Sequence, residues 1–121
     1  MGFPSPADDY ADKRLDVTDL LIAHPEATYF MRTSGEAMIG AGIQDRDLVV
    51  IDRSLPASDQ SIIIAKVGTE LLLRRLRMKD GRTWLVPANL AYQSIEVTGR
   101  TDFEVWGVVT WVLHKVAWPL R

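Results

Sequence analysis

The chain has 121 residues, of which 47% are hydrophobic and 25% are charged, with a formal net charge of −2 and no cysteine. This length suits a single domain, and the composition is that of an ordinary soluble globular protein. Disulfides and thiolate metal sites are excluded, and with only His24 and His114 as imidazole ligands we expect no metal and no cofactor. The slightly acidic balance argues against binding nucleic acid by phosphate neutralisation alone.

The first fifteen residues differ in character from the rest of the chain. They include two prolines and a run of charges but little periodicity, so we expect residues 1–15 to form an extended, mobile arm ahead of one domain over residues 16–121. No apolar run reaches the roughly 18 residues of a membrane span, and no signal peptide opens the chain. We therefore expect a cytoplasmic protein.

The domain is expected to begin with a short helix and to continue as strands. Asp16 is the predicted N-cap of a helix that His24 closes, because Pro25 cannot continue it. The Asp80-Gly81 pair predicts a tight hairpin. Apolar runs predict strands over residues 27–32, 47–52, 61–67, 70–78, 83–86, 95–98 and 103–116. One short N-terminal helix and seven strands with tight turns predict a mainly β, curved or barrel-like single domain.

The last predicted strand is apolar on both faces. Strand side chains alternate, so we expect one face to carry the set Phe103, Val105, Val109, Trp111 and Leu113. The other parity also carries apolar residues, which are Trp106, Val108 and Val112. This is more apolar surface than one small sheet readily buries, which favours a dimer face; a two-sided core strand is the alternative.

Arg74 is a cation at an apolar position of the predicted strand over residues 70–78. It shares a face with Leu72 and Leu76, whereas Arg75 and Arg77 share the opposite face, which we expect to be solvated. Because an unpaired buried guanidinium is costly, Arg74 either finds a carboxylate or borders a cleft; snorkelling to solvent is the third interpretation. The basic cluster over residues 74–82 is either a solvated strand face or a nucleic-acid patch.

The stretch SGEAM, residues 34–38, predicts a short capped helix. Ser34 is the expected cap and Gly35 permits a tight turn, which places Ala37 in the first helical turn. Backbone N–H groups at such a turn are able to stabilise an oxyanion. The alternative is a capped turn with a small residue packed beneath it.

These two positions are joined by a resemblance that covers most of the chain. The segments that carry it, in order, are GFPSPADDY, LLIAHPEATYFMRTSGEAM, GAGIQDRDLVVIDRS, RRL, VPANLAYQSI and DFEVWGVVTWVLHKV. The chain resembles the UmuD family, relatives of the self-cleaving domain of the LexA repressor, which implies a LexA C-terminal, peptidase-like β fold. In the family motif S-G-[DE]-S-M the second serine is the nucleophile, and the first residue of a later Lys-Lys or Lys-Arg pair is the general base. The corresponding positions here hold Ala37 and Arg74.

The resemblance therefore implies a peptidase site that has lost its nucleophile and its general base. A serine hydroxyl needs a neighbour that accepts its proton, and lysine does so only as a neutral amine. Alanine has no hydroxyl, and arginine is not deprotonated in proteins. Ser34 lies three residues too early and Lys79 has the wrong strand parity, so we expect neither to substitute. The family also cleaves itself before a glycine followed by Phe-Pro-Ser-Pro, which here is Gly2, so we expect this chain to correspond to the cleaved, UmuD′-like form.

The function that the resemblance implies is that of a binding subunit in SOS mutagenesis. It predicts a homodimer that partners the catalytic subunit of a Y-family, polymerase V-like translesion polymerase and, through it, the RecA filament. Direct contact with nucleic acid is expected to be weak or absent. The alternative is an active serine–lysine self-peptidase of the LexA and UmuD type, and a third interpretation is a β-barrel that binds nucleic acid through residues 74–82.

Overall fold

The structure is a computed structural model that describes residues 16–117. The arm expected over residues 1–15 and the last four residues, 118–121, lie outside the described residues. Within the described part, the helical elements are the α-helix α2 (Val17–Leu21) and the 3-10 helices η1 (Pro25–Ala27) and η2 (Ile39–Ala41). None of them is long and apolar enough to cross a membrane.

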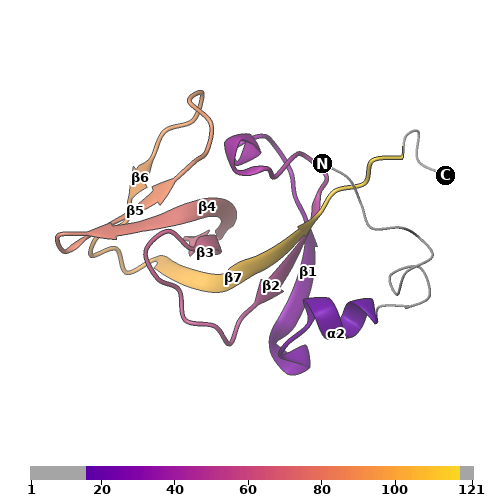
Figure 1. Ribbon diagram of the computed structural model, residues 1–121. Coiled ribbons are helices and arrows are strands. Elements are labelled where there is room, and N and C mark those ends of the chain that lie inside the picture. The colour runs from indigo at the N-terminus through magenta and orange to yellow at the C-terminus, as the bar shows by residue number, and fades with distance from the viewer. Residues whose placement is uncertain (1–15, 118–121) are drawn as a thin grey trace.

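Seven strands form one antiparallel sheet in the order β1-β2-β7-β3-β4-β5-β6. They are β1 (Thr28–Arg32), β2 (Leu48–Asp52), β3 (Ile62–Val67), β4 (Glu70–Lys79), β5 (Arg82–Val86), β6 (Ile95–Glu96) and β7 (Phe103–Leu113). Figure 1 shows β7 as a long, bent strand that connects the β1–β2 part of the sheet to the β3–β4–β5 part. The predicted mainly β fold with one short α-helix is confirmed.

The N-terminal helix is shorter than predicted. The carboxylate of Asp16 accepts a hydrogen bond from the Thr18 N–H at 3.0 Å, which confirms Asp16 as the N-cap. The helix nevertheless ends at Leu21, so the prediction that His24 closes it is wrong. The residue before a proline is disfavoured in the helical region, and His24 instead pairs with the Asp52 carboxylate, with 2.6 Å between Nδ1 and Oδ2.

Strand β7 does not keep one set of side chains on one face. Its pairing shifts register opposite Val50/Ile51 of β2 and again opposite Ile64/Ala65 of β3. Each shift inserts an extra residue and reverses the alternation of the side chains that follow. Val109 and Val112 consequently pack against the same cluster although their parity differs, so the prediction that all the odd-numbered apolar residues share a face is wrong.

Two apolar clusters fill the interior on either side of this curved sheet region. The first is made of buried residues from the loop after β1 and from β2 and β3, namely Met38, Ile43, Val49, Ile51 and Ile64. The second lies under the β3–β4–β5 part and contains Ile63, Ala65, Leu76, Leu85 and Val97. The first cluster matters for the site because Met38 and Ile43 anchor the loop that contains Ala37.

Candidate functional site

The loop that contains SGEAM turns sharply rather than forming a helix at once. Gly35 has φ +89, in the left-handed region that favours glycine, and its N–H donates to Asp45 Oδ1 at 2.7 Å. The 3-10 helix η2 begins only at Ile39, with Met38 at the N-cap position and no side-chain cap. The prediction that Ser34 caps this helix is therefore wrong, because Asp45 rather than Ser34 binds the turn. Ala37 precedes the helix instead of lying in its first turn.

The segment between β5 and β6 holds Ala37 in place. Ala88 donates its N–H to the Ala37 carbonyl and accepts from the Gly40 N–H, each at 2.8 Å, and Asn89 Nδ2 donates to the Glu36 carbonyl at 2.9 Å. A Cβ added to Gly40 would lie 2.6 Å from the Ala88 carbonyl oxygen. The two segments therefore approach so closely that only glycine fits at position 40 without a backbone shift. This contact sets the position of Ala37 relative to the sheet.

Strand β4 supplies Arg74, which is half-buried. Its Nη1 donates to the backbone oxygen of Leu73 at 2.8 Å, and its Nε is buried without a hydrogen-bond partner. The guanidinium carbon lies 5.7 Å from the centre of the Tyr92 ring. Burial lowers the pKa of Arg74, and the interaction with Tyr92 acts in the opposite direction. Among residues 16–117 no carboxylate forms an ion pair with Arg74, so of the three interpretations the one that fits is a strand bordering a cleft.

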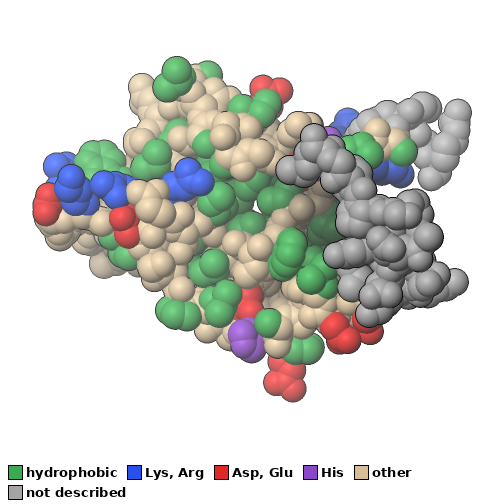
Figure 2. All heavy atoms as spheres, viewed as in Figure 1, with side chains coloured by type: hydrophobic (Ala, Val, Ile, Leu, Met, Phe, Trp, Pro, Cys, Tyr) green, Lys and Arg blue, Asp and Glu red, His purple; other side chains and the backbone are tan. Residues whose placement is uncertain are grey.

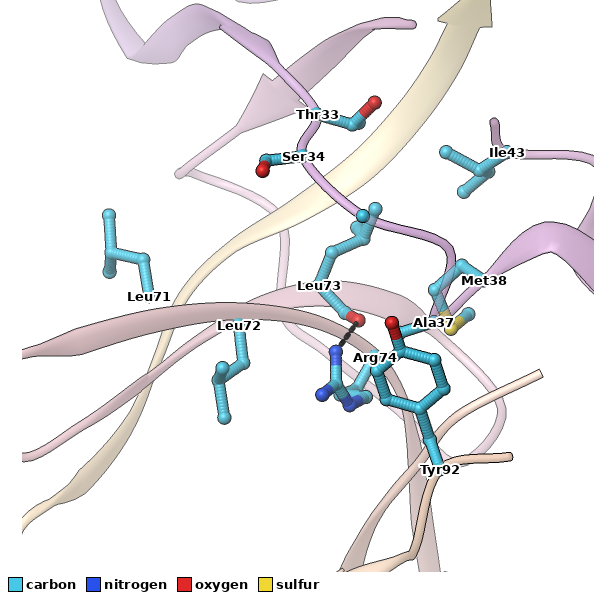
Figure 3. Close-up of a pocket in the computed structure, with 11 residues that line it drawn as sticks. Thr33, Ser34, Ala37, Met38, Ile43, Leu71, Leu72, Leu73, Arg74 and Tyr92 are labelled. Carbon is cyan, nitrogen blue, oxygen red and sulfur yellow. Dashed lines mark hydrogen bonds between the residues drawn. The ribbon is translucent and has the colours of Figure 1, made fainter. Parts of the chain in front are cut away.

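Ala37 and Arg74 line the same pocket, of about 160 Å³ (Figure 3). The loop after β1 contributes one wall, strand β4 the opposite wall and Tyr92 a side; the lining residues are Thr33, Ser34, Gly35, Ala37, Met38, Ile43, Leu71, Leu72, Leu73, Arg74 and Tyr92. The structure thus brings together the two positions that the sequence analysis selected. A methyl group and a guanidinium supply neither a nucleophile nor a base. Their correspondence to a serine and a lysine stays a prediction.

The two substitutes considered from the sequence lie in different places. Ser34 lines the pocket, together with Thr33, whereas Lys79 is exposed at the far end of β4, opposite Arg82. Among the described residues, no lysine lines this pocket. Sequence reasoning did not single out Thr33 or Tyr92. Tyr92 follows β5 in a segment without periodicity, so no local pattern placed its ring beside Arg74.

The two histidines are engaged at opposite ends of β2. His24 pairs with Asp52, and His114 Nδ1 lies 2.6 Å from Asp47 Oδ1; both carboxylates are buried. Over residues 16–117 no three side chains of the His, Cys, Asp and Glu types gather as metal ligands. These pairs tie the segments that follow α2 and β7 to the two ends of β2.

Two cations of the basic cluster after Arg74 have acidic partners; Figure 2 shows Lys and Arg side chains gathered at the end of the molecule formed by the β4–β5 hairpin, with a few acidic side chains beside them. Arg77 pairs with Asp59 at 2.8 Å, and Arg82 makes two hydrogen bonds to Glu96, at 2.8 and 2.9 Å. Arg75 is half-buried with a buried Nε, so the expectation of a solvated Arg75 is wrong; its strand partners Ile62 and Val86 flank it on both sides. The pairing of Arg77 and Arg82 supports the strand-face interpretation over a nucleic-acid patch, although Arg75 and Lys79 have no acidic partner among residues 16–117.

Comparisons with known proteins support the resemblance that the sequence suggests. The model of the peptidase S24-like family matches residues 1–110. The chain is 40% identical to protein MucA of Escherichia coli over 110 residues, which is 90% of this chain and 75% of that protein. It is 39% identical to protein ImpA of Salmonella typhimurium over 114 residues, covering 94% and 77%. It is also 41% identical to LexA repressor 2 of Pseudomonas syringae pv. tomato over 87 residues, covering 72% of this chain and 43% of the repressor.

Proposed function

The chain belongs to the peptidase S24-like family, as a UmuD-like member, and on this premise we propose that it is a binding subunit without peptidase activity. In this proposal a homodimer serves as the accessory subunit of an SOS-induced translesion polymerase. Its partners are the catalytic subunit of a Y-family, polymerase V-like enzyme and, through that enzyme, the RecA filament. These partners are inferred from the resemblance to the UmuD family. The structure of the pocket supports the proposed loss of peptidase activity.

The proposal depends mainly on the observation that Ala37 and Arg74 line one pocket. A serine–lysine peptidase needs a hydroxyl beside an amine that apolar surroundings keep neutral. The apolar wall is present, since Leu71, Leu72 and Leu73 line the pocket. The reactive groups are not, because a methyl group has no proton to give and a guanidinium stays charged. Loss of a serine nucleophile alone costs on the order of a millionfold in rate.

The second candidate function is an active self-peptidase, and the position of Ser34 is the observation in its favour. Ser34 lines the pocket, so a hydroxyl is present near Ala37. Within residues 16–117 it lacks a base: no lysine lines the pocket, and neither histidine lies there, because His24 and His114 bind Asp52 and Asp47. A hydroxyl without a proton acceptor is a poor nucleophile. We therefore favour the binding subunit.

Exposed apolar residues on the sheet support self-association. Phe30 of β1 and Trp111 of β7 are both partners of Val50 in β2, so the three point to one face of the sheet, and Leu113 follows on the same face. Phe30 is 49% exposed, Trp111 43% and Leu113 38%. We call Phe30, Trp111 and Leu113 the aromatic patch. Exposed apolar patches mark interaction surfaces, and a second copy of the chain is the proposed occupant.

Co-sedimentation and a cleavage assay test the proposed function together. The purified chain is mixed with the catalytic subunit of a Y-family polymerase, with and without RecA filaments on single-stranded DNA, and in parallel with full-length MucA as a peptidase substrate. We expect two copies of the chain to sediment with the polymerase subunit and MucA to stay intact. A chain that binds no polymerase subunit, or that cleaves MucA, would contradict the proposal.

A further inference from the structure

The pocket contains a cation that no carboxylate among residues 16–117 neutralises. Arg46, Arg77, Arg82 and Arg100 each have an acidic partner among residues 16–117. Arg74 has none, although it is half-buried, and its buried Nε donates no hydrogen bond. Withdrawing a guanidinium from water without a counter-charge is unfavourable, and an anionic ligand would relieve that cost. The charge of the pocket thus favours an anion.

The immediate surroundings of Arg74 limit the kind of anion. The opposite wall is a loop whose Ala37 and Met38 amides donate no hydrogen bond to any residue between 16 and 117. Leu72 and Leu73 of β4 supply an apolar wall, and Tyr92 lies on the other side of Arg74 (Figure 3). One guanidinium and one apolar wall suit a monovalent carboxylate better than a phosphate dianion, whose charge proteins usually balance with more than one cation.

A second pocket continues the first along β4. It measures about 220 Å³ and shares Thr33, Ser34, Leu71 and Leu73 with the first pocket. Its remaining lining consists of the apolar Met31, Val49 and Ile64 and the exposed Arg32. Each pocket is smaller than the roughly 300–1,000 Å³ of typical small-molecule sites. Two small pockets side by side, one with the half-buried Arg74 and one that is mainly apolar apart from the exposed Arg32, fit a single amino-acid residue with its charged end better than a larger compact ligand.

We propose that this pair of pockets binds the C-terminal residue of an extended peptide from a partner protein. The terminal carboxylate pairs with Arg74, and the last side chain, which is apolar, enters the pocket formed by Met31, Val49 and Leu71. Capture of a terminal carboxylate beside an apolar pocket is a recurring way of recognising peptides. The inference goes beyond the proposed function, because it depends on the charge and shape of the pockets and not on which polymerase the protein serves.

The test compares one dipeptide in two forms on the unaltered chain. Acetyl-Ser-Leu with a free carboxylate and acetyl-Ser-Leu-amide are titrated by two-dimensional amide NMR. We expect the acid to bind at least about tenfold more tightly than the amide, and to shift the signals of Leu73, Arg74 and Tyr92. Equal affinity for the two forms, or no saturable binding of either up to solubility, would overturn the proposal.

Two further ligands separate a terminal carboxylate from other anions. Inorganic phosphate and the internal-acid peptide acetyl-Ala-Glu-Ala-amide are titrated in the same way. We expect both to bind at least about tenfold more weakly than acetyl-Ser-Leu. If either binds as tightly, the site is a general anion site or an acidic side-chain site, and recognition of a C-terminal residue is refuted.

Variants of Arg74 test whether this residue causes the tighter binding of the acid than of the amide. Arg74→Gln is expected to remove the preference for the acid over the amide, and Arg74→Lys to keep most of it, because lysine retains the charge. Lys79→Gln is the matched control, since it removes one positive charge from the exposed end of the same strand and should change nothing. A preference that survives in a folded Arg74→Gln protein contradicts the assignment. These readouts involve no polymerase and no peptide cleavage, so they are independent of the tests of the proposed function.

Discussion

Ala37 and Arg74 line one pocket, the first from the loop after β1 and the second from strand β4. The loop reaches β4 because Ala88 binds it from the other side, through hydrogen bonds to the Ala37 carbonyl and from the Gly40 amide. This arrangement makes three segments, distant in the sequence, into one site. It also makes the position of Ala37 depend on contacts that can be altered singly.

The close approach of Gly40 to Ala88 predicts a specific loss of stability. Gly40→Ala would place a Cβ 2.6 Å from the Ala88 carbonyl oxygen, which is backbone and must shift. Overpacking of this kind costs about 1–3 kcal/mol of unfolding free energy, measured here by urea denaturation. Glu36→Ala, which truncates an exposed side chain in the same loop, is the control and should change stability by less than about 0.5 kcal/mol. Equal effects of the two substitutions would show that the contact is not tight.

Asp52 predicts a loss of stability in acid. The Ser54 hydroxyl, which donates to Oδ1 at 2.6 Å, and His24, at 2.6 Å from Oδ2, lower the pKa of this buried carboxyl from its usual 3.8 to about 2. Because the pKa is lower in the folded state than in the unfolded state, the stabilisation is fully present above about pH 4 and is lost as the pH falls toward 2.

Urea unfolding of the unaltered chain and of Asp52→Asn between pH 6 and pH 2 measures this contribution. We expect a constant difference in unfolding free energy above about pH 5, which shrinks as the pH falls from about 4 to 2. Glu104→Gln, an exposed residue of β7, is the control and should follow the unaltered chain. A difference between the unaltered chain and Asp52→Asn that does not depend on pH would contradict the role given to Asp52.

The aromatic patch predicts the surface of self-association. Trp111→Glu places a charge beside Phe30 on this face and should weaken the dimer at least about tenfold, as expected for a central aromatic contact. Leu90→Glu introduces the same charge at a fully exposed residue between β5 and β6 and should leave the dimer intact. Sedimentation equilibrium at tens of micromolar measures both. An unaltered chain that is already monomeric at that concentration would refute the proposed dimer.

Features set by local chemistry were predictable from the sequence. The Asp80-Gly81 turn is one, because both residues adopt positive φ, 53 and 75, and Lys79 pairs with Arg82 across it. The N-cap of α2 by Asp16 is another. Each depends on contacts among two or three neighbouring residues, so a short sequence pattern is enough to predict it.

Features set by contacts between distant segments were not predictable. The two register shifts in β7 depend on how β2 and β3 pair with it; Gly107, beside the second shift, is a local sign of a bulge or close approach but does not by itself set the register. The late start of η2 at Ile39 depends on Asp45 and Ala88, which bind the loop from outside. Strand parity identified Arg74 as an unusual cation, but only the family resemblance connected it with Ala37.

Restoring the two side chains tests the central interpretation most directly. The double variant Ala37→Ser with Arg74→Lys, the two single variants and the unaltered chain are each incubated with full-length MucA, and cleavage is followed by mass spectrometry. We predict cleavage in trans by the double variant alone, because a serine needs a neutral amine and a lysine needs a hydroxyl to activate. Cleavage by the unaltered chain, or none by a folded double variant, would show that Ala37 and Arg74 do not occupy the nucleophile and base positions.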